Sequence, residues 1–154
     1  MSKKFTLVLI TKNNQILLGL KKRGFGMGKF NGFGGKVEAD ESIEEAARRE
    51  VFEETSLEIK TLTKLAIIDF AWQDNKRPPQ EVHVFYSDNF IGRPEETEEM
   101  RPNWFDIDKI PYKKMWDDDK YWFPLFLKKE QFKAQFLFDK HDKITSHQIK
   151  VEAL

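Results

Sequence analysis

Three glutamates are spaced so that a helix would bring their carboxylates together. Glu50, Glu53 and Glu54 stand at positions i, i+3 and i+4, and side chains at this spacing lie about 5 to 6 Å apart on one helix face. In one interpretation they form a solvated acidic face, whose repulsion is offset by Arg48 and Arg49. In the other, their oxygen atoms bind Mg²⁺ or Mn²⁺, which keep part of their water and hold a substrate phosphate.

A loop rich in glycine and in basic residues precedes these glutamates and favours the metal interpretation. Seven of the eight glycines fall between Gly19 and Gly35, which predicts a loop system with unusual backbone angles. Its spacing fits neither the dinucleotide-binding nor the Walker pattern. Residues 1–35 carry seven bases and no acid, whereas residues 36–58 carry nine acids and three bases. A polyphosphate bridged by a metal ion would use both segments.

Three consecutive aspartates lie beside a group of aromatic residues. Asp117, Asp118 and Asp119 follow Trp116 and precede the aromatic run 121–123. Aspartate commonly opens helices, so we expect one of the three to be an N-cap. The alternative is a base-binding pocket, in which two desolvated carboxyls cannot both ionise easily and one holds a proton. Such a pair can donate and accept hydrogen bonds, and exchange of the proton would let one pocket bind either of two base edges.

Composition excludes several other kinds of site. The chain of 154 residues has no cysteine, which excludes disulfides, thiolate metal sites and cysteine nucleophiles. Its three histidines lack the spacing of a metal site. Lys plus Arg equals Asp plus Glu at 26 each, so no overall field attracts nucleic acid or an anionic membrane. The apolar run 5–10 is too short for a membrane span or signal peptide. We expect a soluble protein that binds neither nucleic acid nor membrane.

The hydrophobic pattern predicts the elements that would position these groups. Strands are expected at residues 5–11, 15–20, 62–72, 81–85, 103–106, 133–138 and 143–151, with the first two forming a hairpin. The segment 81–85 is too apolar for an exposed edge and should be central. A capping box at Ser42 and Glu45 predicts a helix at 43–55, and a second helix should run from 118 or 119 to about 129. The length fits one domain, 1–154. We expect an α/β fold whose mixed sheet has a helix on each face.

The separations around the glutamates resemble the Nudix box. Gly35, five residues, Glu41, seven residues and the run from Arg49 to Glu54 agree with that motif at seven specified positions. The motif then expects glycine where this chain has Ser56. A left-handed helix end at Ser56 would cost about 1 kcal/mol relative to glycine.

Segments beyond the box resemble the oxidised-purine nucleoside triphosphatases of the Nudix family over nearly the whole chain. The resemblance rests on residues 21–26, 30–36, 99–102 and 115–124. It implies the Nudix α/β/α sandwich and an Mg²⁺-dependent enzyme, with Mn²⁺ as an alternative. The implied reaction converts 8-oxo-dGTP, 2-hydroxy-dATP and related modified purine nucleotides to the monophosphate and pyrophosphate, which sanitises the nucleotide pool. We expect a cytoplasmic monomer, with mitochondrial and nuclear pools as further locations.

The resemblance also assigns roles to individual residues. Metal ligands would be the Gly34 carbonyl, Glu50, Glu53, Glu54 and Glu99. The proton acceptor would be Glu53 or Glu99, and Arg49 would orient Glu53. The catalytic residues are then Arg49, Glu50, Glu53, Glu54 and Glu99. Lys21 and Lys36 are the expected phosphate contacts. The full set of substrate-binding residues is Thr6, Lys21, Phe25, Asn31, Phe33, Gly34, Gly35, Lys36, Phe70, Trp116, Asp118 and Asp119.

The chain departs from close family members at three positions, and two other functions stay open. Gln80 replaces a methionine, Asp117 a proline and Phe30 a tryptophan, which leaves the rank order of purine substrates undecided. One alternative is a Nudix hydrolase of another nucleoside diphosphate derivative, which would differ at Asn31 and residues 116–119. The other is a non-catalytic nucleic-acid-binding module that uses the basic loop and its phenylalanines, against which the neutral net charge argues.

Overall fold

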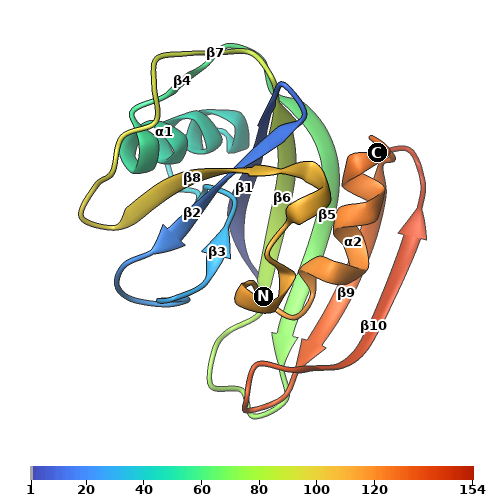
Figure 1. Ribbon diagram of the computed structural model, residues 1–154. Helices are drawn as coiled ribbons and strands as arrows, with labels where there is room; N and C mark the ends of the chain where they lie inside the picture. The colour runs from blue at the N-terminus through green and yellow to red at the C-terminus, as the bar shows by residue number, and fades with distance from the viewer. Residues whose placement is uncertain (1) are drawn as a thin grey trace.

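The computed structural model describes residues 2–154 and has one large sheet between two helices (Figure 1). The helices are α1 (Ile43–Thr55) and α2 (Asp119–Leu127), and two short 3-10 turns, η1 (Ile107–Lys109) and η2 (Tyr112–Lys114), precede α2. The strands are β1 (Lys3–Lys12), β2 (Gln15–Lys21), β3 (Phe30–Asn31), β4 (Glu58–Ile59), β5 (Thr63–Trp72), β6 (Gln80–Ser87), β7 (Phe90–Ile91), β8 (Met100–Asp106), β9 (Phe132–Phe138) and β10 (Ile144–Val151). Within residues 2–154, no helix is long and apolar enough to cross a membrane.

The large sheet is mixed, as the sequence predicts. Its strand order is β10-β9-β5-β6-β1-β2-β3, β8 also pairs with β2, and β4 pairs with β7 in a separate small sheet. The pairs β1·β6 and β5·β9 are parallel, whereas β1·β2 and β5·β6 are antiparallel. Strand β6 lies between β5 and β1, which confirms the prediction that residues 81–85 are central.

The two faces of the sheet pack on different helices. Alternate side chains of a strand point to opposite faces, and β1 shows this directly. Leu9 belongs to a buried cluster that contains Trp122 of α2. Val8 and Ile10 belong to a second buried cluster that contains Val51 of α1. Figure 1 shows α1 and α2 on opposite sides of the central strands, so the predicted sandwich is confirmed.

Helix α1 begins and ends where the sequence predicts. Ser42 Oγ accepts a hydrogen bond from the Glu45 N–H at 3.1 Å, and Glu45 Oε1 accepts one from the Ser42 N–H at 2.9 Å. At the other end, Ser56 adopts the left-handed conformation, with φ 68° and ψ 9°. The capping box therefore opens the helix, and a non-glycine residue closes it under strain.

The start of α2 differs from the expected N-cap. Asp118 occupies the N-cap position but makes no capping hydrogen bond through its side chain. The Asp117 carboxylate instead accepts hydrogen bonds from Lys120 Nζ at 3.0 Å and from the Ile144 N–H at 2.9 Å. Asp117 thus joins the helix start to β10, and one of the three aspartates, Asp118, takes the N-cap position without the side-chain hydrogen bond of a capping residue.

Three strands were not predicted from the sequence, because each has only two residues. β3, β4 and β7 are too short to show an alternating pattern. They matter because β3 pairs with β2 through Gly19↔Asn31 and Leu20↔Phe30. This pairing returns the chain to the sheet after the glycine-rich loop.

We expect Ser56→Gly to raise the free energy of unfolding by about 0.5 to 1 kcal/mol, because glycine adopts a positive φ without steric cost. The variant loses the hydrogen bond from Ser56 Oγ to Glu95 Oε2 at 3.2 Å, which is exposed and contributes little. The control is Ser146→Gly in β10, where φ is not positive and glycine should destabilise the strand. Urea denaturation measures both, and a less stable Ser56→Gly protein would contradict the strain at this helix end.

Candidate active site

One arginine connects the carboxylates at the start and along the face of α1. Arg49 donates from Nε and Nη2 to both carboxylate oxygens of Glu41, at 2.9 and 2.6 Å. Its Nη1 donates to Glu50 at 2.9 Å and to Glu53 at 3.3 Å, and Nη2 also reaches the Lys36 carbonyl at 3.2 Å. A bidentate arginine–carboxylate pair has a defined geometry. Arg49 therefore fixes the direction of neighbouring glutamates, as expected of a residue that orients Glu53.

Glu41 has a structural role that the sequence reasoning did not assign. The hydrogen bonds from Arg49, together with one from the Glu38 N–H, lower the pKa of Glu41 to about 2. In turn, Glu41 raises the pKa of Arg49. The pair is thus charged at any ordinary pH. In the sequence, Glu41 and Arg49 lie eight positions apart, across a loop and the start of α1. No helical spacing rule predicts a contact at this separation.

Glu54 is the buried carboxyl of the helix. Its exposed fraction is 3%, and Oε1 accepts a hydrogen bond from the Gly34 N–H at 2.9 Å. Burial, reinforced by the charge of Glu50, raises the pKa of Glu54 to about 8, although the Gly34 bond opposes the shift. Burial also raises the pKa of Glu50, opposed by Arg49. A nearby cation would reverse both shifts, because it favours the ionised carboxylates.

Two glycines bring the loop close enough to contact Glu54. A Cβ at Gly34 would overlap the carbonyl oxygen of Thr6, and one at Gly35 would lie 2.6 Å from the Glu50 carboxylate. The Thr6 N–H donates to the Gly35 carbonyl at 2.9 Å, which ties the loop to β1. The chain thus passes between β1 and α1 in a space that admits only glycine.

The carboxylates fit a divalent metal ion by the chemistry of their donors. They offer only oxygen ligands, which Mg²⁺ and Mn²⁺ prefer. Within residues 2–154, no three His, Cys, Asp or Glu side chains are arranged closely enough to hold a cation. Glu50 and Glu53 contact Arg49, and Glu99 lies 4.0 Å from Lys21 Nζ. Binding of a metal would therefore require these side chains to turn from their present partners.

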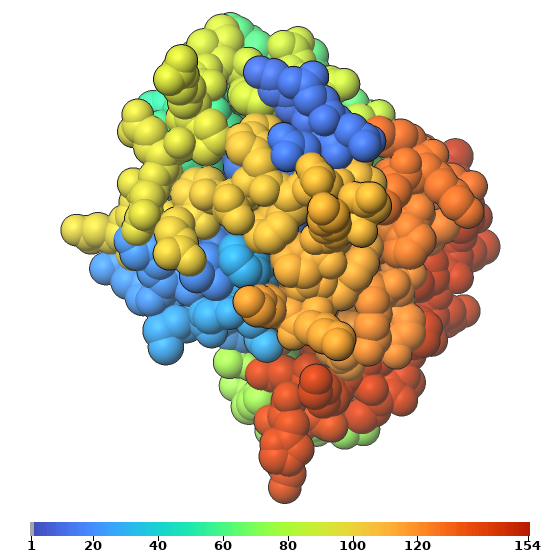
Figure 2. Space-filling view, in the orientation of Figure 1, coloured from blue at the N-terminus to red at the C-terminus, as the bar shows by residue number. Residues whose placement is uncertain are grey.

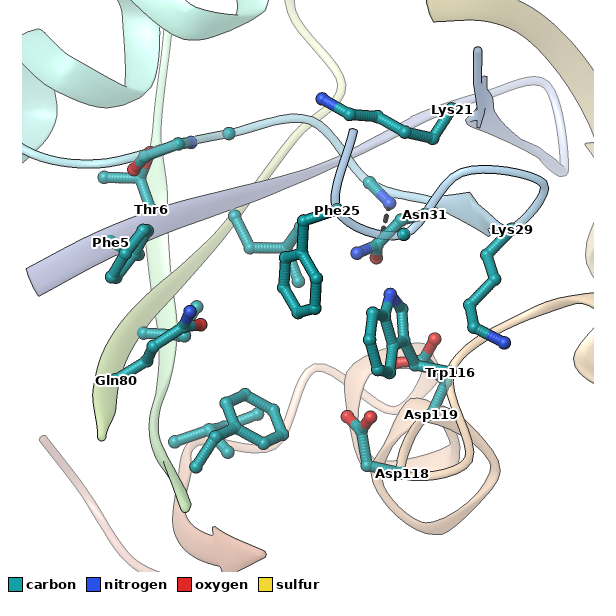
Figure 3. Close-up of a pocket in the computed structure, with 18 of the residues that line it drawn as sticks. Phe5, Thr6, Lys21, Phe25, Lys29, Asn31, Gln80, Trp116, Asp118 and Asp119 are labelled. Carbon is teal, nitrogen blue, oxygen red and sulfur yellow. Dashed lines mark hydrogen bonds between the residues drawn. The ribbon is translucent and has the colours of Figure 1, made fainter. Parts of the chain in front are cut away.

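A single cavity of about 270 Å³ connects this region to the paired aspartates (Figure 3). Eleven of the predicted site residues line it, namely Thr6, Lys21, Phe25, Asn31, Gly34, Gly35, Glu54, Phe70, Trp116, Asp118 and Asp119. Six other predicted residues do not line it, namely Phe33, Lys36, Arg49, Glu50, Glu53 and Glu99. The Phe33 side chain is instead fully buried in the cluster beneath α1. In the space-filling view the glycine-rich loop adjoins the surface formed by residues 100–120 (Figure 2).

Asp118 and Asp119 form a desolvated pair at the far end of the cavity. Their exposed fractions are 3% and 2%. Trp122 Nε1 donates to Asp118 Oδ2 at 2.8 Å, whereas Asp119 Oδ2 has no partner among the described residues. Burial raises the pKa of Asp118, and burial together with the charge of Asp118 raises the pKa of Asp119 further. Burial and mutual repulsion therefore disfavour ionisation of both carboxyls, which agrees with the prediction of a raised pKa on one member of the pair.

Aromatic rings form the walls between the two ends. Phe25 and Trp116 have ring centroids 4.9 Å apart, and Phe70 stacks on Phe136 and Phe138 at 5.8 Å each. Arg77, whose Cζ lies 3.9 Å from the Phe25 ring centre, was not predicted from the sequence. The same holds for several lining residues, among them Lys29, Trp72 and Phe138. Their only signal was an aromatic or basic side chain, which is equally typical of a core or a solvated loop.

The raised pKa of Glu54 predicts a pH-dependent stability. A carboxyl whose pKa is higher in the folded state stabilises the fold at low pH, and this contribution is lost as the pH rises through the folded-state value. For Glu54 the window runs from 4.5 to about 8. We expect Glu54→Gln to stabilise the metal-free protein at about pH 9 by on the order of 2 kcal/mol and to remove most of this slope.

The control for this experiment is Glu53→Gln, since the Glu53 side chain is 56% exposed and its replacement should leave the slope unchanged. Mg²⁺ should raise the melting temperature of the parent protein at alkaline pH and raise that of Glu54→Gln less. Thermal melts across pH, with and without Mg²⁺, measure both effects. Equal pH slopes in the parent and Glu54→Gln proteins would show that Glu54 is not the buried titrating group.

Comparison with known proteins agrees with this geometry. Residues 3–126 match the NUDIX domain model. The chain is 52% identical to the oxidized purine nucleoside triphosphate hydrolase of Danio rerio, over 96% of this chain and 94% of that protein. It is 46% identical to the protein of the same name from Mus musculus, over 97% and 95%. The crystal structure of a mutator MutT protein from Bacillus halodurans superposes with a TM-score of 0.87 at 24% identity, over 98% and 99% of the two chains, and so supports the fold. The chain therefore belongs to the Nudix family of hydrolases.

Proposed function

We propose that this enzyme hydrolyses oxidised purine nucleoside triphosphates to the monophosphate and pyrophosphate, and so sanitises the nucleotide pool. The relatives from Danio rerio and Mus musculus carry the name of this activity. The observation that carries the proposal is the continuous cavity with Glu54 and Gly34 at one end and the Asp118–Asp119 pair at the other. A nucleotide has the same two parts, a polyphosphate and a base.

The aspartate end has the groups to bind the Watson–Crick edge of a purine. A protonated Asp119 can donate and an ionised Asp118 can accept. Asn31 Oδ1 already accepts from the Gly32 N–H at 2.8 Å, which leaves its amide nitrogen available to a ligand. The rings of Phe25, Trp116 and their neighbours offer faces against which the base can stack.

The glutamate end would bind the metal and the phosphates. When bound, Mg²⁺ supplies charge neutralisation and lowers the pKa of an attacking water. We propose Glu50, Glu53, Glu54, Glu99 and the Gly34 carbonyl as its ligands, with Arg49 holding Glu50 and Glu53 in direction. Lys21, the last residue of β2, lines the cavity and would bind a phosphate together with Lys36, which follows Gly35. The exposed Glu53 and Glu99 are the candidates to accept the proton from water.

We further propose that residues 1–154 form a single Nudix domain that acts as a monomer. Although the family match ends at residue 126, β9 continues the same sheet by pairing with β5, and β10 pairs with β9. A cytoplasmic enzyme, which also serves mitochondrial or nuclear nucleotide pools, would meet the proposed substrates.

A panel of purine nucleoside triphosphates tests the proposed reaction. We expect 8-oxo-dGTP and 2-hydroxy-dATP to be hydrolysed at least tenfold faster than dGTP and dATP, because a site that pairs with buried polar groups rejects a base that cannot satisfy them. The products should be the monophosphate and pyrophosphate, and activity should require Mg²⁺. Chromatography identifies the products, and hydrolysis in ¹⁸O-water locates the phosphorus that is attacked. Release of orthophosphate, or equal rates on all four nucleotides, would contradict the proposal.

A second prediction concerns the proton on Asp119. Asp119→Asn keeps a donor at this position but prevents proton exchange with Asp118. It should shift the ratio of kcat/KM for 8-oxo-dGTP and 2-hydroxy-dATP by more than about tenfold, or about 1.4 kcal/mol, toward the base whose edge accepts from the amide. Asp117→Asn is the matched control, because Asp117 contacts Lys120 and Ile144 outside the cavity lining. An equal shift of this ratio in both variants would contradict the role of the Asp118–Asp119 pair in base recognition.

A further inference from the structure

One polar side chain interrupts an apolar wall of the cavity. Gln80 lines the cavity beside Phe5, Phe70 and Val82, and none of these neighbours has a side-chain hydrogen-bonding group. Figure 3 shows Gln80 across the cavity from Asp118 and Asp119, with Phe25 between them in this view and Trp116 beside the aspartates. The polar groups of the base-binding end thus occur on two sides.

The backbone holds Gln80 in a fixed position. As the first residue of β6, it pairs with Lys3 of β1 on one side and with Phe70 of β5 on the other. The side chain is partly buried, yet its amide makes no hydrogen bond to any group within residues 2–154. Its amide atoms are not among the fully buried polar atoms that lack a partner, so the amide stays accessible in the cavity. A ligand with a matching polar edge can pair with it.

We infer that the Gln80 amide reads the imidazole edge of an 8-oxopurine while the Asp118–Asp119 pair holds the opposite edge. This inference rests on the proposed function and names the substrate class within it. An 8-oxopurine carries a hydrogen on N7 beside the oxygen on C8. A primary amide presents an acceptor oxygen and two donor hydrogens side by side, so both of its functions pair with this edge.

Other purines satisfy Gln80 less well. Along the N7–C8 edge, unmodified guanine or adenine offers an acceptor at N7 and only a C–H group at position 8, so an amide that lies at this edge has one half left without a partner. A 2-hydroxypurine is oxidised on its pyrimidine ring, and its imidazole edge is that of an ordinary purine. Gln80 therefore favours bases oxidised at position 8 over bases oxidised at position 2.

Gln80→Met tests this inference, because methionine has nearly the same length and no amide. We expect kcat/KM for 8-oxo-dGTP to fall about tenfold, as for loss of paired hydrogen bonds, while kcat/KM for 2-hydroxy-dATP changes less than about twofold. Binding of 8-oxo-dGMP without metal, followed by tryptophan fluorescence, should weaken by a similar factor. Because Trp72, Trp116 and Trp122 line the cavity, this signal is independent of turnover.

The matched control is Gln135→Met on the exposed side of β9, which should leave kcat/KM unchanged for both substrates. Thermal melts of both variants establish that they fold. If Gln80→Met lowers kcat/KM equally for both substrates, or for neither, Gln80 does not bind the imidazole edge, although the proposed function stands. If the parent protein hydrolyses no oxidised purine nucleotide but still binds 8-oxo-dGMP in a Gln80-dependent way, the proposed reaction fails and the inference survives.

Discussion

The passage of Gly34 and Gly35 between β1 and α1 is the constraint on which the rest of the site depends. A side chain at Gly34 would overlap the Thr6 carbonyl, and a side chain at Gly35 would meet the Glu50 carboxylate. Only this close approach lets the Gly34 amide reach the buried Glu54. Since β1 also has Thr6 in the cavity lining, the same passage sets the distance between the carboxylate helix and the base-binding walls.

Buried carboxyls lie at both ends of the cavity, and their environments give them different partners. Glu54 has one backbone donor and a neighbouring negative charge, so burial raises its pKa, and a cation is the ligand that relieves it. Burial and the charge of Asp118 raise the pKa of Asp119, so a proton is the ligand that relieves this carboxyl. The two ends thus suit the metal and the base of the proposed function respectively, although both use the same type of side chain.

Local signals in the sequence were sufficient for α1 and for the long strands, because capping, helix spacing and hydrophobic runs act over a few residues. The box residues were likewise found by their spacing, and the left-handed Ser56 followed from the absent glycine. The pairing of Arg49 with Glu41 could not be predicted, since it depends on the path of the loop before α1. Trp72, Lys29 and Arg77 reach the cavity region through strand register and loop contacts, which no local pattern encodes. The separate roles of the three aspartates were hidden for a similar reason, because Asp117 bonds to Ile144 of a distant strand.

The end of the cavity that holds Asp118 and Asp119 is built from the same packing as the core. Phe70 belongs to the cavity lining and also packs against the cluster around α2, and Trp122 lines the cavity while binding Asp118. The aromatic rings that stabilise the sandwich are therefore the ones that desolvate the aspartates. Desolvation raises the pKa values of the pair, but it also destabilises the free protein, because a buried carboxyl without a partner is unfavourable. Replacements that relieve the buried groups should tend to stabilise the fold and weaken discrimination together, which is the trade-off expected where a binding site occupies part of a core.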